Sequence, residues 1–229
     1  MSGTLTHALH DKRFPNESDA YREARAALLD AEMDLRRRVE AVAALRRALP
    51  PGGMVKEDYL FEEGDPPTPV RLSELFAGHE TLIAYSFMYG PNMPEPCPSC
   101  SSMLDSLDRQ ARFLRERVGL AVIARSPIAR ILTFARERGW RDLRLVSAAG
   151  NTYAQDYLAE TPDGAQRPIM NVFSRRDGAI RHVWASELAF APAEPGQDPR
   201  HIDLLWPLWD VLDLTPEGRG DYRPRLNPG

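Results

Sequence analysis

The sequence has few cysteines, few lysines and no long apolar run. Only two of its 229 residues are cysteine, and only Lys12 and Lys56 are lysine. No uninterrupted apolar run approaches the roughly 18 to 20 residues that a membrane-spanning helix needs. The first residues also lack the apolar core of a secretory signal. We therefore expect a cytoplasmic protein without a membrane partner.

The charge balance argues against a nucleic-acid partner. The chain carries 29 basic and 33 acidic side chains, which leaves a net charge of −4. A nucleic-acid binder held by global charge would have a positive excess. Apart from the two lysines, the basic residues are arginines spread along the whole chain, so they indicate a bias in composition rather than a binding patch. With 43% apolar residues, the chain can bury a substantial core.

Residues 18–49 have the pattern of one long helix. Apolar side chains recur every three or four residues from Tyr21 to Leu49, Ser18 is the expected cap, and Pro50 ends the helix. Such a helix would be about 43 Å long. We expect residues 1–17 to be a mobile tail and residues 18–50 a helical arm. The arm either packs along its own domain or joins a second copy in a homodimer, which is the assembly we expect.

From residue 51 onward, short strands alternate with helices. The expected strands are 59–61, 70–72, 81–87, 120–124, 143–146, 169–173 and 180–184. The expected helices are 99–116, 127–138, 151–157 and 202–212, with Ser126 as the expected cap of the second. The alternation predicts a parallel sheet with helices on both faces, and the last hairpin adds antiparallel strands. This order is typical of a thioredoxin-like three-layer α/β/α sandwich with the extra elements of peroxiredoxins, covering residues 51–229.

Both cysteines lie in the segment Cys97-Pro98-Ser99-Cys100, where a helix is expected to begin. Unpaired amides and the positive end of a helix dipole stabilise a thiolate and lower the pKa of a cysteine. We expect Cys97 to cap the helix as the attacking thiol, with Pro98 in the first helical position and Cys100 in the first turn as the resolving thiol. This pattern predicts a thiol-disulfide oxidoreductase without a cofactor, which acts on a protein or small-molecule disulfide and uses a thiol reductant.

Three further residues are candidates for a supporting role at the dithiol. Pro168 precedes the first strand of the closing hairpin, where thioredoxin-like folds usually present a cis proline, although an ordinary trans proline is the alternative. Arg125 ends a buried strand, and Arg167 precedes Pro168. Ligands of open α/β sheets gather at the carboxyl ends of strands, so we expect one of these arginines near the Cys97 thiolate. The alternative is that both are ordinary surface residues.

Other interpretations of the cysteine pair stay open. A C-x-x-C pair is also half of a zinc site, but the chain offers only His7 and His10 at a matching spacing. A pair of inert buried thiols has the same spacing. A thiol-dependent peroxidase or redox sensor, and a non-catalytic thioredoxin-like binding module, are the two alternative functions.

Several segments together resemble a large, mostly uncharacterised bacterial family of predicted dithiol-disulfide oxidoreductases with a thioredoxin-like fold. The resemblance covers about residues 20–222. It rests on Tyr21-Arg22-Glu23-Ala24-Arg25 with Leu28-Leu29, on Leu49-Pro50, on Asp58-Tyr59-Leu60-Phe61, on Phe87-Met88-Tyr89-Gly90-Pro91, on Cys97-Pro98-Ser99-Cys100, and on Leu212-Asp213-Leu214-Thr215-Pro216-Glu217-Gly218-Arg219. It implies the same fold and a dithiol at Cys97 and Cys100.

The chain departs from the peroxiredoxin motif P-x-x-x-[ST]-x-x-C. The residues seven and three positions before Cys97 are Gly90 and Pro94, and those before Cys100 are Met93 and Cys97. Neither cysteine therefore has the proline and hydroxyl that the motif requires, and the expected chemistry is dithiol exchange rather than peroxide reduction.

Overall fold

The computed structural model describes residues 10–176, 178–192, 195, 206–218 and 220–227. The chain divides into two compact units, Met1–Pro50 and Pro51–Gly229. The first contains α1 (Asp19–Arg47), which confirms the predicted long helix. Ser18 caps it, because its hydroxyl accepts a hydrogen bond of 3.2 Å from the Tyr21 amide. No helix among the described residues is long and apolar enough to cross a membrane.

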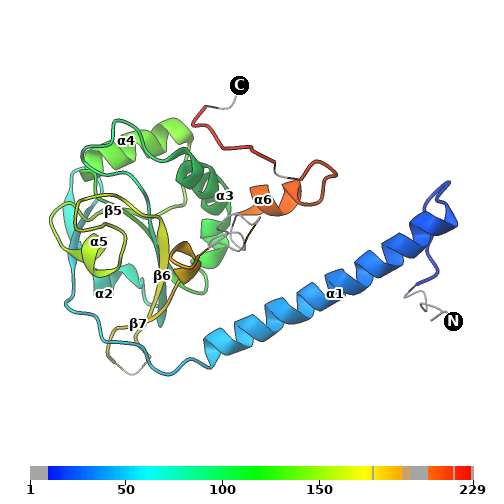
Figure 1. The fold of residues 1–229 in the computed structure, drawn as a ribbon. Helices are drawn as coiled ribbons and strands as arrows, with labels where there is room; N and C mark the ends of the chain where they lie inside the picture. The colour runs from blue at the N-terminus through cyan, green and yellow to red at the C-terminus, as the bar shows by residue number, and fades with distance from the viewer. Residues whose placement is uncertain (1–9, 177, 193–194, 196–205, 219, 228–229) are drawn as a thin grey trace. The chain divides into compact units, whose positions relative to one another are not determined.

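The second unit is built on one mixed sheet (Figure 1). Its strands are β1 (Leu60–Glu63), β2 (Thr68–Arg71), β3 (Thr81–Ser86), β4 (Gly119–Ala124), β5 (Leu145–Ser147), β6 (Ile169–Ser174) and β7 (Arg181–Ala185), in the order β2-β1-β5-β4-β3-β6-β7. β3 runs parallel to β4, and β4 runs parallel to β5. β6 is antiparallel to β3, and β7 is antiparallel to β6.

Helices cover both faces of this sheet. They are α2 (Leu72–Leu75), α3 (Pro98–Leu114), α4 (Ile128–Arg138), α5 (Tyr153–Asp156), the short 3-10 helix η1 (Glu187–Ala189) and α6 (Pro207–Leu212). Every residue of β4 is buried. Leu120 and Val122 pack into an apolar cluster with α3 and α4, whereas Ala121 and Ile123 pack into a second cluster with α2 and α5. The unit is therefore a three-layer α/β/α sandwich with a thioredoxin-like fold, as predicted.

Two helix starts differ from the prediction. Leu72 was expected to end a strand, but it begins α2, because the Glu74 carboxylate accepts a hydrogen bond of 2.6 Å from the Arg71 amide and both leucines of the turn are buried. Pro127 was expected in the first helical position, but α4 begins at Ile128 with Pro127 as its cap. The Ser126 hydroxyl, expected to cap α4, donates instead to the Gly90 carbonyl at 3.1 Å.

The elements near the carboxyl end differ in extent from the prediction. α5 begins at Tyr153 with Thr152 as its cap, and the Asn151 side chain accepts a hydrogen bond of 3.0 Å from the Tyr153 amide. The last predicted helix, 202–212, is seen as α6 from Pro207, and residues 202–205 lie outside the described residues. Residues 1–9 of the predicted tail and Asp177, between β6 and β7 in the sequence, also lie outside them.

Candidate functional site

The two cysteines lie where the chain passes from β3 into α3. Cys97 is the N-cap of α3, and Pro98 occupies the first turn, where a missing amide hydrogen leaves no helical bond unmade. The Cys97 backbone is fixed on both sides. Its amide donates to the Met88 carbonyl at 3.0 Å, and its carbonyl accepts from the Ser101 hydroxyl at 2.9 Å. The local fold therefore holds the first sulfur over the amides that open the helix.

The two thiols differ in exposure. Both are free, and Cys97 is partly exposed whereas Cys100 is 2% exposed. The Cys100 amide points at the Cys97 sulfur, with 3.5 Å between nitrogen and sulfur. Solvent therefore reaches Cys97 more readily, while Cys100 is packed in the core.

The electrostatics of the helix start separate the acidities of the two thiols. Hydrogen bonding from the Cys100 thiol lowers the pKa of Cys97 to about 6, and the amides of Cys100 and Ser99 act in the same direction against the opposing effect of burial. For Cys100, the thiol of Cys97 and burial raise the pKa well above its usual value. At neutral pH the pair therefore holds one thiolate, on the more exposed sulfur.

Arg130, in the first turn of α4, organises the loop that leads into Cys97, and it is not among the site residues predicted from the sequence. Its guanidinium donates to the Pro94 carbonyl at 2.8 Å and also to the carbonyls of Met93, Gly90 and Pro91. It lies 4.4 Å from the centre of the Tyr89 ring. These partners are backbone carbonyls 36 to 40 positions away in the sequence, so no local motif marks this arginine.

The predicted supporting residues lie at the carboxyl end of β3. Ser86, the last residue of β3, pairs with Ile169, so Pro168 lies beside the chain that continues from β3 toward the dithiol. Its peptide bond is not cis, because Asp65-Pro66 is the cis bond of the described chain, which corrects the interpretation of Pro168 as a cis proline.

The two predicted arginines have other partners. Arg125 forms an ion pair of 2.9 Å with Glu160 and donates to the Ala148 carbonyl at 2.8 Å, while Arg167 lies over the Phe190 ring. Both line a small cavity with Phe87. Neither makes a hydrogen bond to a sulfur in the described part of the chain, so a role at the thiolate stays a prediction.

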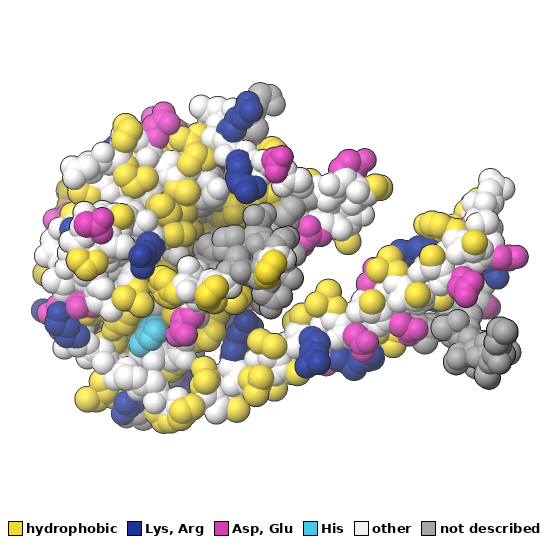
Figure 2. All heavy atoms as spheres, in the orientation of Figure 1, with side chains coloured by type: hydrophobic (Ala, Val, Ile, Leu, Met, Phe, Trp, Pro, Cys, Tyr) yellow, Lys and Arg dark blue, Asp and Glu magenta, His cyan; other side chains and the backbone are white. Residues whose placement is uncertain are grey.

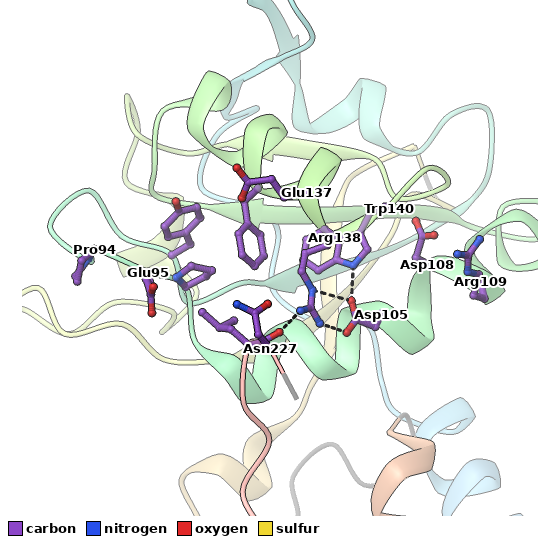
Figure 3. Close-up of a pocket in the computed structure, with 14 residues that line it drawn as sticks. Pro94, Glu95, Asp105, Asp108, Arg109, Glu137, Arg138, Trp140 and Asn227 are labelled. Atoms are coloured by element: carbon purple, nitrogen blue, oxygen red, sulfur yellow. Dashed lines mark hydrogen bonds and ion pairs between the residues drawn. The ribbon is translucent and has the colours of Figure 1, made fainter. Parts of the chain in front are cut away.

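A larger pocket of about 520 Å³ begins one residue before Cys97 (Figure 3). Pro94, Glu95 and Pro96 form one wall, and helices α3 and α4 with residues 226–227 form the others. Within it, Asp105 accepts a hydrogen bond of 2.8 Å from the Trp140 indole and pairs with Arg138, which also donates to the Leu226 carbonyl. This network ties α3, α4 and the end of the described chain together.

Comparison with protein families identifies a match over nearly the whole chain. The model of the family described as "Bacterial protein of unknown function (DUF899)" matches residues 11–227. The chain belongs to this DUF899 family. A search of curated proteins found no match. The family name carries no activity, so the chemistry of this DUF899 chain has to be argued from the site itself.

Solved structures that resemble this DUF899 chain include peroxiredoxins. Peroxidoxin BcpB from Mycobacterium tuberculosis is 16% identical with a TM-score of 0.47, and the match covers 72% of this chain and 98% of that one. Peroxiredoxin Q of Xanthomonas campestris is 12% identical with a TM-score of 0.47, covering 70% and 96%. A hypothetical protein, SMc02350, from Sinorhizobium meliloti 1021 is 17% identical with a TM-score of 0.43, covering 77% and 90%. The fold assignment rests on the strand order given above.

The site offers no grouping for a metal ion. In the ranges that the structure describes, no three His, Cys, Asp or Glu side chains gather closely enough to hold one. His7, which the zinc interpretation requires, is not among those residues. The chemistry available at this position is that of two sulfur atoms with different acidities.

Proposed function

We propose that this DUF899 chain is a thiol-disulfide oxidoreductase in which Cys97 attacks and Cys100 resolves. The observation that carries the proposal is the asymmetry of the pair. The more exposed sulfur is the one whose pKa is lowered to about 6, and the buried sulfur is the one whose pKa is raised. A dithiol that reduces disulfides needs this division, because the thiolate attacks and a held second thiol must then displace it.

The proposed reaction has two steps. The Cys97 thiolate attacks one sulfur of a substrate disulfide, an S–S bond forms to Cys97, and the other substrate sulfur leaves as a thiolate. Cys100 then loses its proton and attacks the Cys97 sulfur. The Cys97–Cys100 disulfide forms, and the second substrate sulfur leaves and takes up a proton. A thiol reductant returns the pair to the dithiol. The substrate is a protein or small-molecule disulfide.

Single-cysteine variants test this proposal. Cys100→Ser keeps the attacking thiolate and lacks the resolver, so it should accumulate mixed disulfides with a small disulfide such as hydroxyethyl disulfide. Cys97→Ser should accumulate at least tenfold less at neutral pH, because its remaining thiol is buried and burial alone still raises the pKa of Cys100. Intact-mass measurement quantifies both adducts. Equal adduct formation by the two variants contradicts the assignment of roles.

The same experiment with hydrogen peroxide in place of the disulfide distinguishes the proposed function from the alternative of a thiol-dependent peroxidase. A thiol-dependent peroxidase would consume hydrogen peroxide catalytically and pass through a sulfenic acid on one cysteine. We expect the wild-type chain to react faster with the small disulfide than with peroxide, because both cysteines lack the P-x-x-x-[ST]-x-x-C context. Turnover of peroxide with a sluggish disulfide reaction would favour the peroxidase, and inertness toward both would favour a binding module.

A further inference from the structure

Tyr85 places a buried hydroxyl beside the resolving cysteine. The residue lies in β3, is 0% exposed, and belongs to the same apolar cluster as Cys100. Its hydroxyl has no hydrogen-bond partner of normal geometry among the described residues, but it lies near enough to Cys100 for each group to affect the pKa of the other. Buried hydroxyls are normally paired, because leaving one unpaired costs the desolvation of that group. An unpaired phenol near a reactive sulfur therefore needs an explanation.

The sulfur of Cys100 is the polar group that the phenol meets. Tyr85 and the Met88 amide both act on Cys100 in the direction that lowers its pKa, against the larger effects of Cys97 and burial. Burial, followed by the two cysteines, raises the pKa of Tyr85 well above its ordinary value. The protonated phenol is therefore the favoured form of Tyr85, and this form has a hydrogen to donate to the Cys100 sulfur.

A neutral thiol and a thiolate differ in what they offer this donor. Thiol sulfur is a weak acceptor, which fits a Tyr85 hydroxyl without a hydrogen-bond partner of normal geometry in the dithiol state. A thiolate is a charged acceptor, and hydrogen bonds to charged groups are about twice as strong as neutral ones. The hydrogen bond from the phenol is consequently strongest when Cys100 carries negative charge. A donor that is already held in place in a site without water does not have to reorganise when this charge forms.

We propose that Tyr85 is a positioning residue that stabilises the Cys100 thiolate during the resolving step, through a hydrogen bond from its phenol. This inference rests on the proposed dithiol function. In that step Cys100 gives up its proton and its sulfur forms a bond to the Cys97 sulfur. The Cys97–substrate bond breaks, and the departing sulfur keeps the electron pair and takes a proton from solvent. Tyr85 neither gains nor loses a proton, and the Met88 amide is the second donor to the same sulfur.

A chromophoric disulfide separates the two steps in one experiment. When the reduced full chain reacts with the aromatic disulfide DTNB, attack by Cys97 releases a first equivalent of coloured thiolate, and resolution by Cys100 releases the second. We expect Tyr85→Phe to leave the first phase within twofold of wild type and to slow the second by about tenfold at neutral pH, which is the loss of one charge-assisted hydrogen bond. The pH profile of the second phase should also move to higher pH.

Tyr153→Phe is the matched control. Tyr153 is also 0% exposed with an orphaned hydroxyl, but it belongs to the other apolar cluster, so both of its phases should match wild type. Circular dichroism checks folding, and Tyr85→Met repeats the test if the phenylalanine variant is unfolded, because methionine fills irregular core space.

Two results would overturn the role of Tyr85. One is an unchanged second phase in the Tyr85 variant, and the other is equal slowing in the Tyr153 control. A wild-type chain that releases no second equivalent would instead contradict the proposed function, and the role of Tyr85 with it.

Discussion

The Cys97 sulfur owes its acidity to neighbours within three residues. The thiol of Cys100 and the amides of Cys100 and Ser99 all stabilise its thiolate, and no basic side chain is needed for this effect. With a pKa of about 6, Cys97 is mostly thiolate at pH 7. A stabilised thiolate favours the dithiol over the disulfide, so it makes the pair a better oxidant and makes Cys97 a better leaving group when the disulfide is reduced.

The first prediction concerns the pH dependence of Cys97. The pKa of this thiol is lowered, so its alkylation by iodoacetamide should rise about tenfold per pH unit below pH 6 and level off above it. Cys100→Ser removes the thiol that contributes most to the lowering, so its profile should move to higher pH. Peptide mapping at each pH checks both. A wild-type profile that rises only above pH 8 would contradict the account.

The sequence predicts the residues of the dithiol better than their partners. Cys97 as cap and Pro98 in the first turn follow from a C-P-x-C pattern before an apolar helix, because the local physics of a helix start fixes both. Tyr85 and Arg130 act across the fold, through a strand neighbour and through loop carbonyls, and no spacing in the sequence reveals such contacts. The trans bond before Pro168 likewise depends on tertiary context.

Elements with a clear apolar period are predictable, and short ones are not. β3, β4, α3 and α4 are each close to their predicted ranges, because their side chains face a core on one or both sides. The four residues of α2 are too few to show a helical period, so a strand was expected at Leu72. The hydroxyl of Ser126 was expected to cap α4, but it bonds to the loop that leads to Cys97.

The second prediction concerns the contact between α4 and that loop. Arg130→Met removes several hydrogen bonds from a charged donor and the contact with the Tyr89 ring. We expect it to lower the free energy of unfolding by about 1.5 to 3 kcal/mol. Arg136→Met, at an exposed position of the same helix, is the matched control and should change it by less than about 0.5 kcal/mol. Urea denaturation measures both, and equal effects would remove the special role of Arg130.

At the scale of the whole molecule, the main question is what covers the apolar side chains of α1. The α1 helix has an apolar stripe formed by Leu28, Leu35, Val39, Val42 and Leu45, and its own unit buries none of them. Figure 2 shows hydrophobic side chains along the visible face of this helix. Leu35 is 65% exposed and Leu45 is 68% exposed. Isolated helices gain most of their stability by packing an apolar face. The stripe therefore needs a covering surface, which is either the helix's own domain or a second copy of the chain. A second copy of the same helix offers a surface of identical chemistry.

The third prediction is that the protein is a homodimer that depends on this stripe. Leu35→Glu combined with Leu45→Glu should give a monomer at micromolar concentration, because charges would be buried without partners. Arg36→Gln combined with Arg47→Gln changes the net charge equally on other faces of the helix, so that variant should stay dimeric. Light scattering after size exclusion measures the mass of each. A wild-type chain that is monomeric at this concentration would refute the dimer.

An equilibrium redox titration of the full chain tests the central claim most directly. The protein is poised in mixtures of reduced and oxidised glutathione, quenched with acid, alkylated and measured by intact mass. The account predicts one two-electron transition, in which the dithiol converts to a Cys97–Cys100 disulfide, with a potential more oxidising than that of a pair with ordinary thiol pKa values. Two thiols that stay reduced across the whole range, or that form only mixed disulfides with glutathione, would contradict it.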